Sequence, residues 1–251
     1  MFRAVILGFS HMHVNEIAMY LDEQPDFELV GIAEVPSEAE TIPPLRYTPV
    51  WNLNNVKEKY CDNVYEDYTQ MLDELKPDIA FILSENCQKP AIVEECAKRG
   101  VNVCIEKPLA VSLEEAKKIQ ESVDKYGIEA VVNWPVIWTK HILKMMALVK
   151  SGIVGKPIRM RYLNGHTGPL GIGAKHRGVT ESAEEMTDEL RGKTWWHQKK
   201  FGGGVLLDIC GYGCLLTRWA MGADAKSAQA SASTLNTAFG DTADNTAAFI
   251  S

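Results

Sequence analysis

Short apolar runs alternate with amphipathic stretches through the first half of the chain. Runs rich in β-branched and aromatic residues predict six strands, and apolar residues at helical spacing between them predict helices. The predicted strands are residues 2–7, 27–33, 64–65, 79–83, 101–106 and 129–132, and the clearest helices are 14–21, 68–75, 90–99 and 112–126. Strands that alternate with helices indicate a parallel α/β sheet with helices on both faces.

The first predicted strand runs into a glycine turn that opens a helix. Strand, glycine turn and helix begin the Rossmann dinucleotide-binding unit, whose fingerprint is GxGxxG. Here the turn reads Gly8-Phe9-Ser10-His11-Met12-His13, so only the first glycine is kept. The Ser10 hydroxyl could bond a phosphate, whereas a histidine at the third position must push the helix outward or point at the ligand. His11 and His13 can equally be surface or helix-cap histidines.

Glu34 stands at the end of the second predicted strand, about 20 residues after the turn. A carboxylate there accepts hydrogen bonds from the adenosine ribose and repels a 2′-phosphate. The residue therefore predicts NAD as the cofactor, with NADP less favoured. The alternative is an ordinary loop glutamate.

Glu106-Lys107-Pro108 ends the fifth predicted strand. Pro108 has no N–H, so the strand should stop with Lys107 at its carboxyl end, the edge where open α/β sheets bind ligands. A partly desolvated lysine beside an acid can donate a proton to a substrate oxygen and take it back. The alternative is a solvated pair of turn charges.

The second half predicts a different kind of domain. A helix over 142–150 is followed by a glycine stop and a strand near 158, and the glycine-rich, charged stretch 165–193 predicts a loop over the substrate site. After three glycines, Asp208 and Tyr212 are four residues apart and should share one helix face, where they could bind a hydroxyl and move its proton. Alternatively, Asp208 caps the helix and Tyr212 packs. Residues 227–251 alternate small polar and apolar side chains, as in antiparallel strands.

Taken in order, these motifs resemble the Gfo/Idh/MocA family of NAD(P)-dependent oxidoreductases. The resemblance implies a Rossmann domain over residues 1–134 and a substrate-binding α+β domain with an open, mostly antiparallel sheet over 135–251. In that family the second domain continues further, so the chain is expected to be truncated in mid-strand at its C-terminus. The resemblance also implies that Lys107 lies against the nicotinamide ring and the reacting carbon.

The match is uneven at single positions. Ser84 and Asn86 fit the family's motif after the fourth strand, whereas a proline and a histidine of that motif are replaced by Glu85 and Lys89. Asn133 is present without the arginine that usually follows it. The implied cofactor contacts are Gly8, Ser10, His11, Met12, Glu34, Ser84, Asn86, Glu106, Lys107 and Asn133.

The implied catalytic residues are Lys107, Asp208 and Tyr212. Asp208 matches the family, but Tyr212 holds the position of a histidine. A phenol titrates near 10, so it is a poor base at neutral pH unless a nearby cation such as Lys107 lowers its pKa.

The amino-acid composition limits the classes of binding partner that are expected. The 251 residues carry a net charge of −7, which disfavours nucleic acid and anionic membranes as partners and leaves small molecules. Six scattered cysteines without zinc-site spacing indicate reduced thiols and no metal. No apolar run approaches the roughly 20 residues of a membrane span. The protein is expected to be cytoplasmic and to form a homo-oligomer.

The favoured activity is hydride transfer between NAD and a CH–OH carbon of a sugar- or polyol-like substrate. Two alternatives remain open. One is a cofactor-binding sensor or partner protein without turnover, and the other is a glycoside hydrolase that uses NAD transiently.

Overall fold

Six parallel strands form the centre of the first half in the computed structural model, which describes residues 1–165, 168–237 and 239–251. The strands are β1 (Phe2–Leu7), β2 (Phe27–Ala33), β3 (Val64–Tyr65), β4 (Ile79–Ile82), β5 (Asn102–Glu106) and β6 (Ala130–Asn133). Their order in the sheet is β3-β2-β1-β4-β5-β6, so the chain reverses direction across the sheet between β1 and β4. This is the Rossmann order, and the predicted fold class is confirmed.

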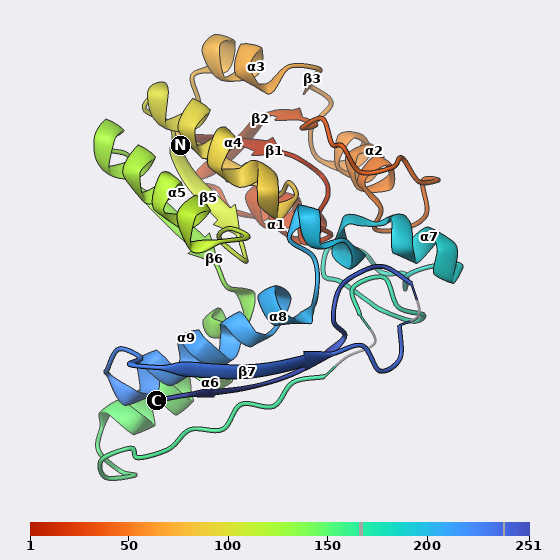
Figure 1. Cartoon of the computed structure of the whole chain (residues 1–251). Coiled ribbons are helices and arrows are strands. Elements are labelled where there is room, and N and C mark those ends of the chain that lie inside the picture. The colour runs from red at the N-terminus through yellow and green to blue at the C-terminus, as the bar shows by residue number, and fades with distance from the viewer. Residues whose placement is uncertain (166–167, 238) are drawn as a thin grey trace.

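Helices cover both faces of this sheet (Figure 1). Val5 and Leu7 of β1 face one core, which packs against α3 (Tyr68–Leu75), α4 (Lys89–Lys98) and α5 (Leu113–Tyr126). Ala4 and Ile6 face the other core, against α1 (Val14–Glu23) and α2 (Pro49–Lys59). Because the central strands β1 and β4 are largely buried on both faces, their sequences are mostly apolar.

The helix ends follow local capping chemistry. Asp67 and Ser112 accept backbone N–H bonds at the first turns of α3 and α5, and Gly127 ends α5 in a left-handed conformation. The apolar spacing of residues 56–60 predicts only a short helix, whereas the observed helix is longer. Pro49 starts α2 seven residues earlier, since a proline suits the first position of a helix.

The second half holds α6 (Lys140–Lys150), α7 (Asp188–Lys193), α8 (Val205–Asp208) and α9 (Cys210–Met221), followed by β7 (Ala228–Ser233) and β8 (Asn245–Ile250). The two strands pair antiparallel from Ala228–Ile250 to Ser233–Asn245. The strand predicted near residue 158 does not form, because residues 156–165 run extended without pairing. Among the described residues, no helix is long and apolar enough to cross a membrane.

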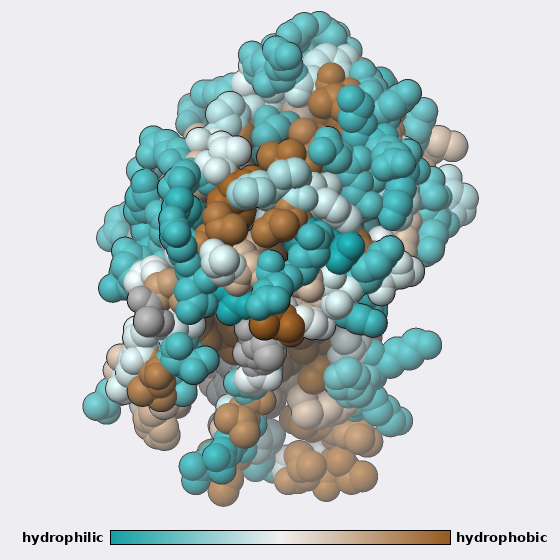
Figure 2. All heavy atoms as spheres, turned by 90° about the vertical axis from the view of Figure 1, so that its right-hand side faces the viewer, coloured by the Kyte–Doolittle hydropathy of each residue, from teal (hydrophilic) through white to brown (hydrophobic). Residues whose placement is uncertain are grey.

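Apolar side chains are exposed mainly in the second half. Figure 2 shows hydrophilic side chains over most of the half that holds the six-stranded sheet, with hydrophobic ones gathered at the lower end. Ile158, Leu163, Leu235 and Phe249 are each more than half exposed. Apolar surface of this kind is typical of regions that contact other chains or segments.

Candidate active site

The glycine turn lies against the carboxyl end of β4. Gly8 has a φ of +82°, and a Cβ there would lie 2.8 Å from three atoms of Ser84. The backbone N–H of His11 donates to the Leu83 carbonyl at 3.0 Å. Only glycine allows this close approach, so Gly8 fixes the turn at the point where the strand order reverses.

Glu34 anchors the other side of the turn. Its Oε1 accepts the backbone N–H of Phe9 at 3.2 Å and that of Val35 at 3.0 Å. Burial raises the pKa of the Glu34 carboxyl to about 7, against the effect of these two bonds, and nearby Glu85 also raises it. The carboxyl is therefore poised to change charge near neutral pH.

A pocket of about 190 Å³ opens beside Glu34. Its wall includes Ser10, Ser37, Glu85 and Trp196. The pocket lies past the carboxyl ends of β1 and β2, the place that this fold uses for the adenosine of a dinucleotide. A glycine that admits close approach, an acid at the end of β2 and a pocket between them all fit NAD.

His13, at the third-glycine position, points across the sheet edge toward β5. Its Nδ1 lies 3.0 Å from Oε1 of Glu106, a side chain that is 1% exposed. Asn133 at the end of β6 donates to Glu106 Oε2 at 2.9 Å. Burial alone would raise the pKa of Glu106, but His13 and then Lys107 and Lys89 outweigh it and hold the pKa below its usual value. Glu106 is thus a buried carboxylate that positions its neighbours.

The structure brings the three predicted catalytic residues together. Lys107, 4% exposed, forms an ion pair with Asp208, which joins the sheet edge to the second half of the chain. The Lys107 Nζ lies 5.6 Å from the centre of the Tyr212 ring. Asp208 ends α8 and Tyr212 belongs to α9, so the single helix predicted for this pair is divided at Ile209.

Tyr212 differs from its predicted chemistry. Burial, followed by the charges of Glu106 and Asp208, raises the pKa of its phenol far above the usual value. The sequence left open that Lys107 lowers this pKa, but burial dominates and the pKa is raised. The Tyr212 ring also packs edge-on against Trp134, with ring centres 4.9 Å apart. These contacts favour a packing role for Tyr212.

Lys89 is a site residue that the sequence did not identify. Its side chain is fully buried, and its Nζ donates to Asn86 Oδ1 at 2.7 Å and to the carbonyls of Glu106 at 2.6 Å and Pro108 at 2.7 Å. Burial lowers the pKa of the ammonium to about 7. Lys89 thereby fixes the backbone on both sides of Lys107. The sequence marked Lys89 only as the replacement for a histidine of the family motif, three residues after Asn86.

Two adjacent tryptophans were also missed. The indole N–H of Trp195 donates to the Ser10 carbonyl at 2.9 Å, and Trp196 meets the His11 ring edge-on with centres 4.8 Å apart. Asn86 donates to the carbonyl of Gly202 at 2.8 Å. The tryptophans thus bring the segment before α8 onto the glycine turn, and the Asn86 contact joins that segment to the residues after β4.

The predicted cofactor residues share one location. They line the turn and the carboxyl ends of β1, β2, β4, β5 and β6, and all are buried or half-buried: Gly8, Ser10, His11, Met12, Glu34, Ser84, Asn86, Glu106, Lys107 and Asn133. Among them, Ser10 and Glu34 line the 190 Å³ pocket.

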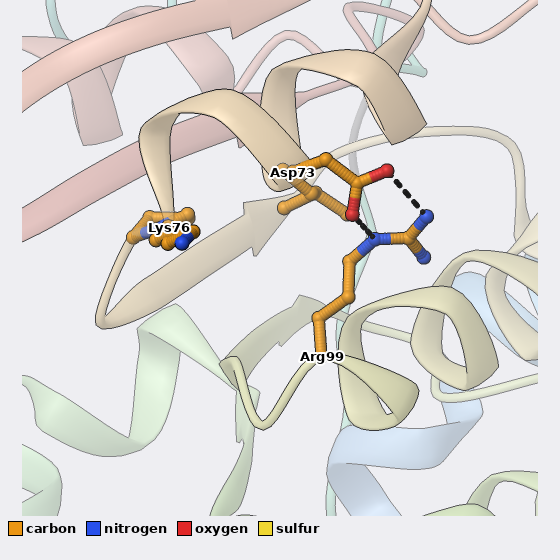
Figure 3. A pocket seen from close by; sticks show the side chains of 5 residues that line it. Asp73, Lys76 and Arg99 are labelled. Atoms are coloured by element: carbon orange, nitrogen blue, oxygen red, sulfur yellow. Dashed lines mark hydrogen bonds and ion pairs between the residues drawn. The ribbon is translucent and has the colours of Figure 1, made fainter.

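A larger hollow of about 270 Å³ lies at the opposite edge of the sheet (Figure 3). Its residues precede β4 and β5 in the chain, so it opens at the amino ends of the strands. Asp73 and Arg99 in its wall already pair with each other at 2.6 Å. The carboxyl edge therefore remains the candidate active site.

Comparison with known proteins agrees with this geometry. Residues 2–134 match the family model described as "Oxidoreductase family, NAD-binding Rossmann fold", and residues 142–251 match the GFO/IDH/MocA C-terminal domain. The chain belongs to the Gfo/Idh/MocA oxidoreductase family, and its first half is the NAD-binding Rossmann domain of that family.

Individual relatives are distant. The chain is 24% identical over 182 residues to scyllo-inositol 2-dehydrogenase (NAD(+)) of Bacillus subtilis, covering 72% of this chain and 45% of that protein. It is 24% identical over 110 residues to myo-inositol 2-dehydrogenase of Thermotoga maritima, covering 43% and 33%. The WlbA dehydrogenase of Bordetella pertussis, solved with NADH and UDP-GlcNAcA, superposes with a TM-score of 0.73 at 16% identity, covering 99% of this chain and 66% of that one. The matched region thus spans less than half of these two curated relatives.

Proposed function

We propose that the protein is an NAD-dependent oxidoreductase that transfers a hydride between nicotinamide and a CH–OH carbon of a sugar- or polyol-like substrate. The observation that carries the proposal is the buried Lys107–Asp208 ion pair. It places an ammonium and a carboxylate from two halves of the chain at the sheet edge where the nicotinamide of a Rossmann dinucleotide lies. The inositol dehydrogenases among the relatives support a polyol substrate.

The chain's own residues would divide the work as follows. Gly8, Ser10 and Glu34 would hold the adenosine end of NAD, and the bound cofactor would supply the hydride acceptor. In alcohol oxidation the neutral amine of Lys107 would accept the proton of the reacting hydroxyl as hydride leaves, and in the reverse direction the Lys107 ammonium would return it. Asp208 would orient the Lys107 side chain and bind a substrate hydroxyl. Tyr212 would pack beside them and exclude water.

Replacement of Lys107 tests this assignment. Lys107→Met keeps the aliphatic stem and removes the donor, so kcat should fall by roughly 10²–10⁴-fold while NAD affinity stays largely unchanged. The assay is NAD reduction with a panel of inositols and sugar alcohols, and the exposed Lys118 on α5 provides the control Lys118→Met. An unaltered kcat in Lys107→Met would exclude the proposed role.

A cofactor-binding protein without turnover is the second candidate. This candidate is supported by Tyr212, which stands where the family has a histidine. The raised pKa of the Tyr212 phenol makes it unsuited to accept a proton. In that case NAD would bind and no substrate of the panel would be oxidised. An NAD-using glycoside hydrolase is a third class, since the chain is 29% identical over 89 residues to a glycosyl hydrolase family 109 protein of Akkermansia muciniphila. Release of a free sugar from a glycoside would identify it.

We also propose the division into domains at residue 134 and a homo-oligomeric assembly. The two family models, which match residues 2–134 and 142–251, support the division. The exposed apolar side chains of the second half support the assembly.

A further inference from the structure

Three side chains that commonly bind metals converge beside the glycine turn. His13 Nδ1 lies 3.0 Å and His11 Nε2 lies 3.8 Å from Oε1 of Glu106. One ligand atom from each residue can be chosen so that all three lie within 4.8 Å of one another. Ligand atoms about 2.0–2.2 Å from a tetrahedral zinc ion are roughly 3.3–3.6 Å apart, so the 3.0 and 3.8 Å separations require only small shifts of the side chains.

His11 provides an independent indication of a missing ligand. It is 1% exposed, and its Nε2 has no hydrogen-bond partner within the described part of the chain. A buried polar atom without a partner is unfavourable by about 1–3 kcal/mol, so such an atom calls for an explanation.

We propose that His11, His13 and Glu106 bind a divalent first-row transition ion, with zinc as the probe ion. Two imidazoles and one carboxylate form a recurrent three-ligand set that leaves a coordination position open. Neither His11 nor His13 takes part in the proposed proton transfer at Lys107. Because His11 and Glu106 are also predicted cofactor contacts, the metal titration is carried out without NAD.

The surroundings can support such an ion. Asn133 already orients Glu106 through its second oxygen, as supporting residues do around metal ligands. Asp208 pairs with Lys107 and offsets part of its positive charge, and His13, at 19% exposed, provides a route of entry. Ligation through His11 Nε2 puts the ring proton on Nδ1. The 3.2 Å contact from the His13 N–H to Nδ1 therefore gives way when the ion binds.

Calorimetric titration of the metal-free, NAD-free full chain with Zn²⁺ tests the site. We expect one zinc per chain. We also expect His13→Gln and His11→Gln each to weaken zinc binding at least about tenfold. Replacing a residue that only orients a metal ligand already lowers metal affinity by about 10–100-fold, so removing a ligand should lower it at least as much. The matched control is His141→Gln, an exposed histidine on α6, which should bind as the wild type does. Equal affinity in all four proteins would assign zinc to surface groups and overturn the proposal.

Cobalt(II) binding provides a second test, and this test does not require the variant of the buried His11 to fold. His13 is partly exposed, so His13→Gln should keep the wild-type melting temperature. Bound Co²⁺ should give visible d–d bands in the wild type and in His141→Gln and lose them in His13→Gln. Absence of these bands in the wild type would overturn the proposal, whatever the NAD titrations show.

Discussion

Replacing Glu34 with glutamine should stabilise the folded chain and weaken its preference for NAD. In the wild type the Glu34 carboxyl has a pKa of about 7, raised by burial from 4.5. Glutamine has nearly the same shape and can still accept the N–H groups of Phe9 and Val35, but it is never charged. The substitution therefore isolates the effect of burying this negative charge.

The magnitude follows from the two pKa values. A difference of about 2.5 corresponds to about 3 kcal/mol at 1.36 kcal/mol per pKa unit. Because the folded chain holds the proton more tightly, the contribution of Glu34 is fully present below pH 4.5 and is lost as the pH rises through 7. The free energy of unfolding of Glu34→Gln relative to wild type should thus increase by about 3 kcal/mol between pH 4.5 and pH 8.

The affinity of the wild type for NAD should rise with pH, whereas the stability contribution of Glu34 falls. A charged acceptor makes hydrogen bonds roughly twice as strong as a neutral one, so the ionised carboxylate should bind the ribose hydroxyls more tightly by about 1 kcal/mol. Wild-type affinity for NAD should rise severalfold from pH 6 to pH 8, while affinity for NADP should not rise with it.

Urea unfolding and calorimetry with both cofactors at pH 5, 6, 7 and 8 measure the two effects. Glu34→Gln should bind NAD and NADP with more similar affinities and with little pH dependence. If the variant keeps the wild-type preference and pH profile, Glu34 does not contact the ribose. If its relative stability does not change with pH, the carboxyl does not titrate near 7.

Three further predictions concern the frame of the site. Gly8→Ala should lower the free energy of unfolding by more than about 2 kcal/mol and abolish NAD binding, because a left-handed φ adds to the 2.8 Å approach to Ser84. The control Gly100→Ala, at φ +70° in open space, should lower the free energy of unfolding by only about 1 kcal/mol, measured by urea unfolding, and should bind NAD normally. The pKa of Lys89 is about 7 in the folded chain and 10.5 ordinarily. The free energy of unfolding of the wild type, relative to that of Lys89→Met, should therefore increase by about 1.4 kcal/mol per pH unit between pH 7 and pH 10. If this relative free energy does not change with pH, the ammonium stays charged in the folded chain. Tyr212→Phe should lower kcat less than tenfold, and a loss of 10²-fold or more would restore the phenol as a proton carrier.

The periodicity of the sequence predicted the sheet well, because strands buried on both faces are apolar throughout. It failed at α2, where the run of asparagines read as a polar loop. In the structure Asn15, Asn52 and Asn55 are buried and bond one another, and Asn52 also donates to the carbonyls of Phe9 and Tyr47. A buried amide network looks like surface in sequence, because its partners come from distant segments.

The same reason limits what the sequence shows of the site. Lys107 and Asp208 lie at the ends of recognisable local patterns, so the sequence pointed to both as candidates. The contacts of Lys89 and Trp195 are with carbonyls 17 to 185 residues away, and no local pattern predicts those contacts. His13 is visible in the turn, but its contact with Glu106 spans 93 residues.

Glu34 and Glu106 show how the structure separates two acids that the sequence presents alike. Each follows an apolar strand, yet Glu106 is surrounded by His13, Lys107 and Lys89, which keep it ionised. Burial raises the pKa of Glu34 to about 7 against two backbone N–H bonds, and Glu85 adds to the rise. A carboxyl whose cationic partners are built into the protein serves to position its neighbours. A carboxyl that remains costly to ionise in the folded chain gains most from a ligand that brings hydroxyl donors, and we therefore propose that the ribose of NAD binds at Glu34.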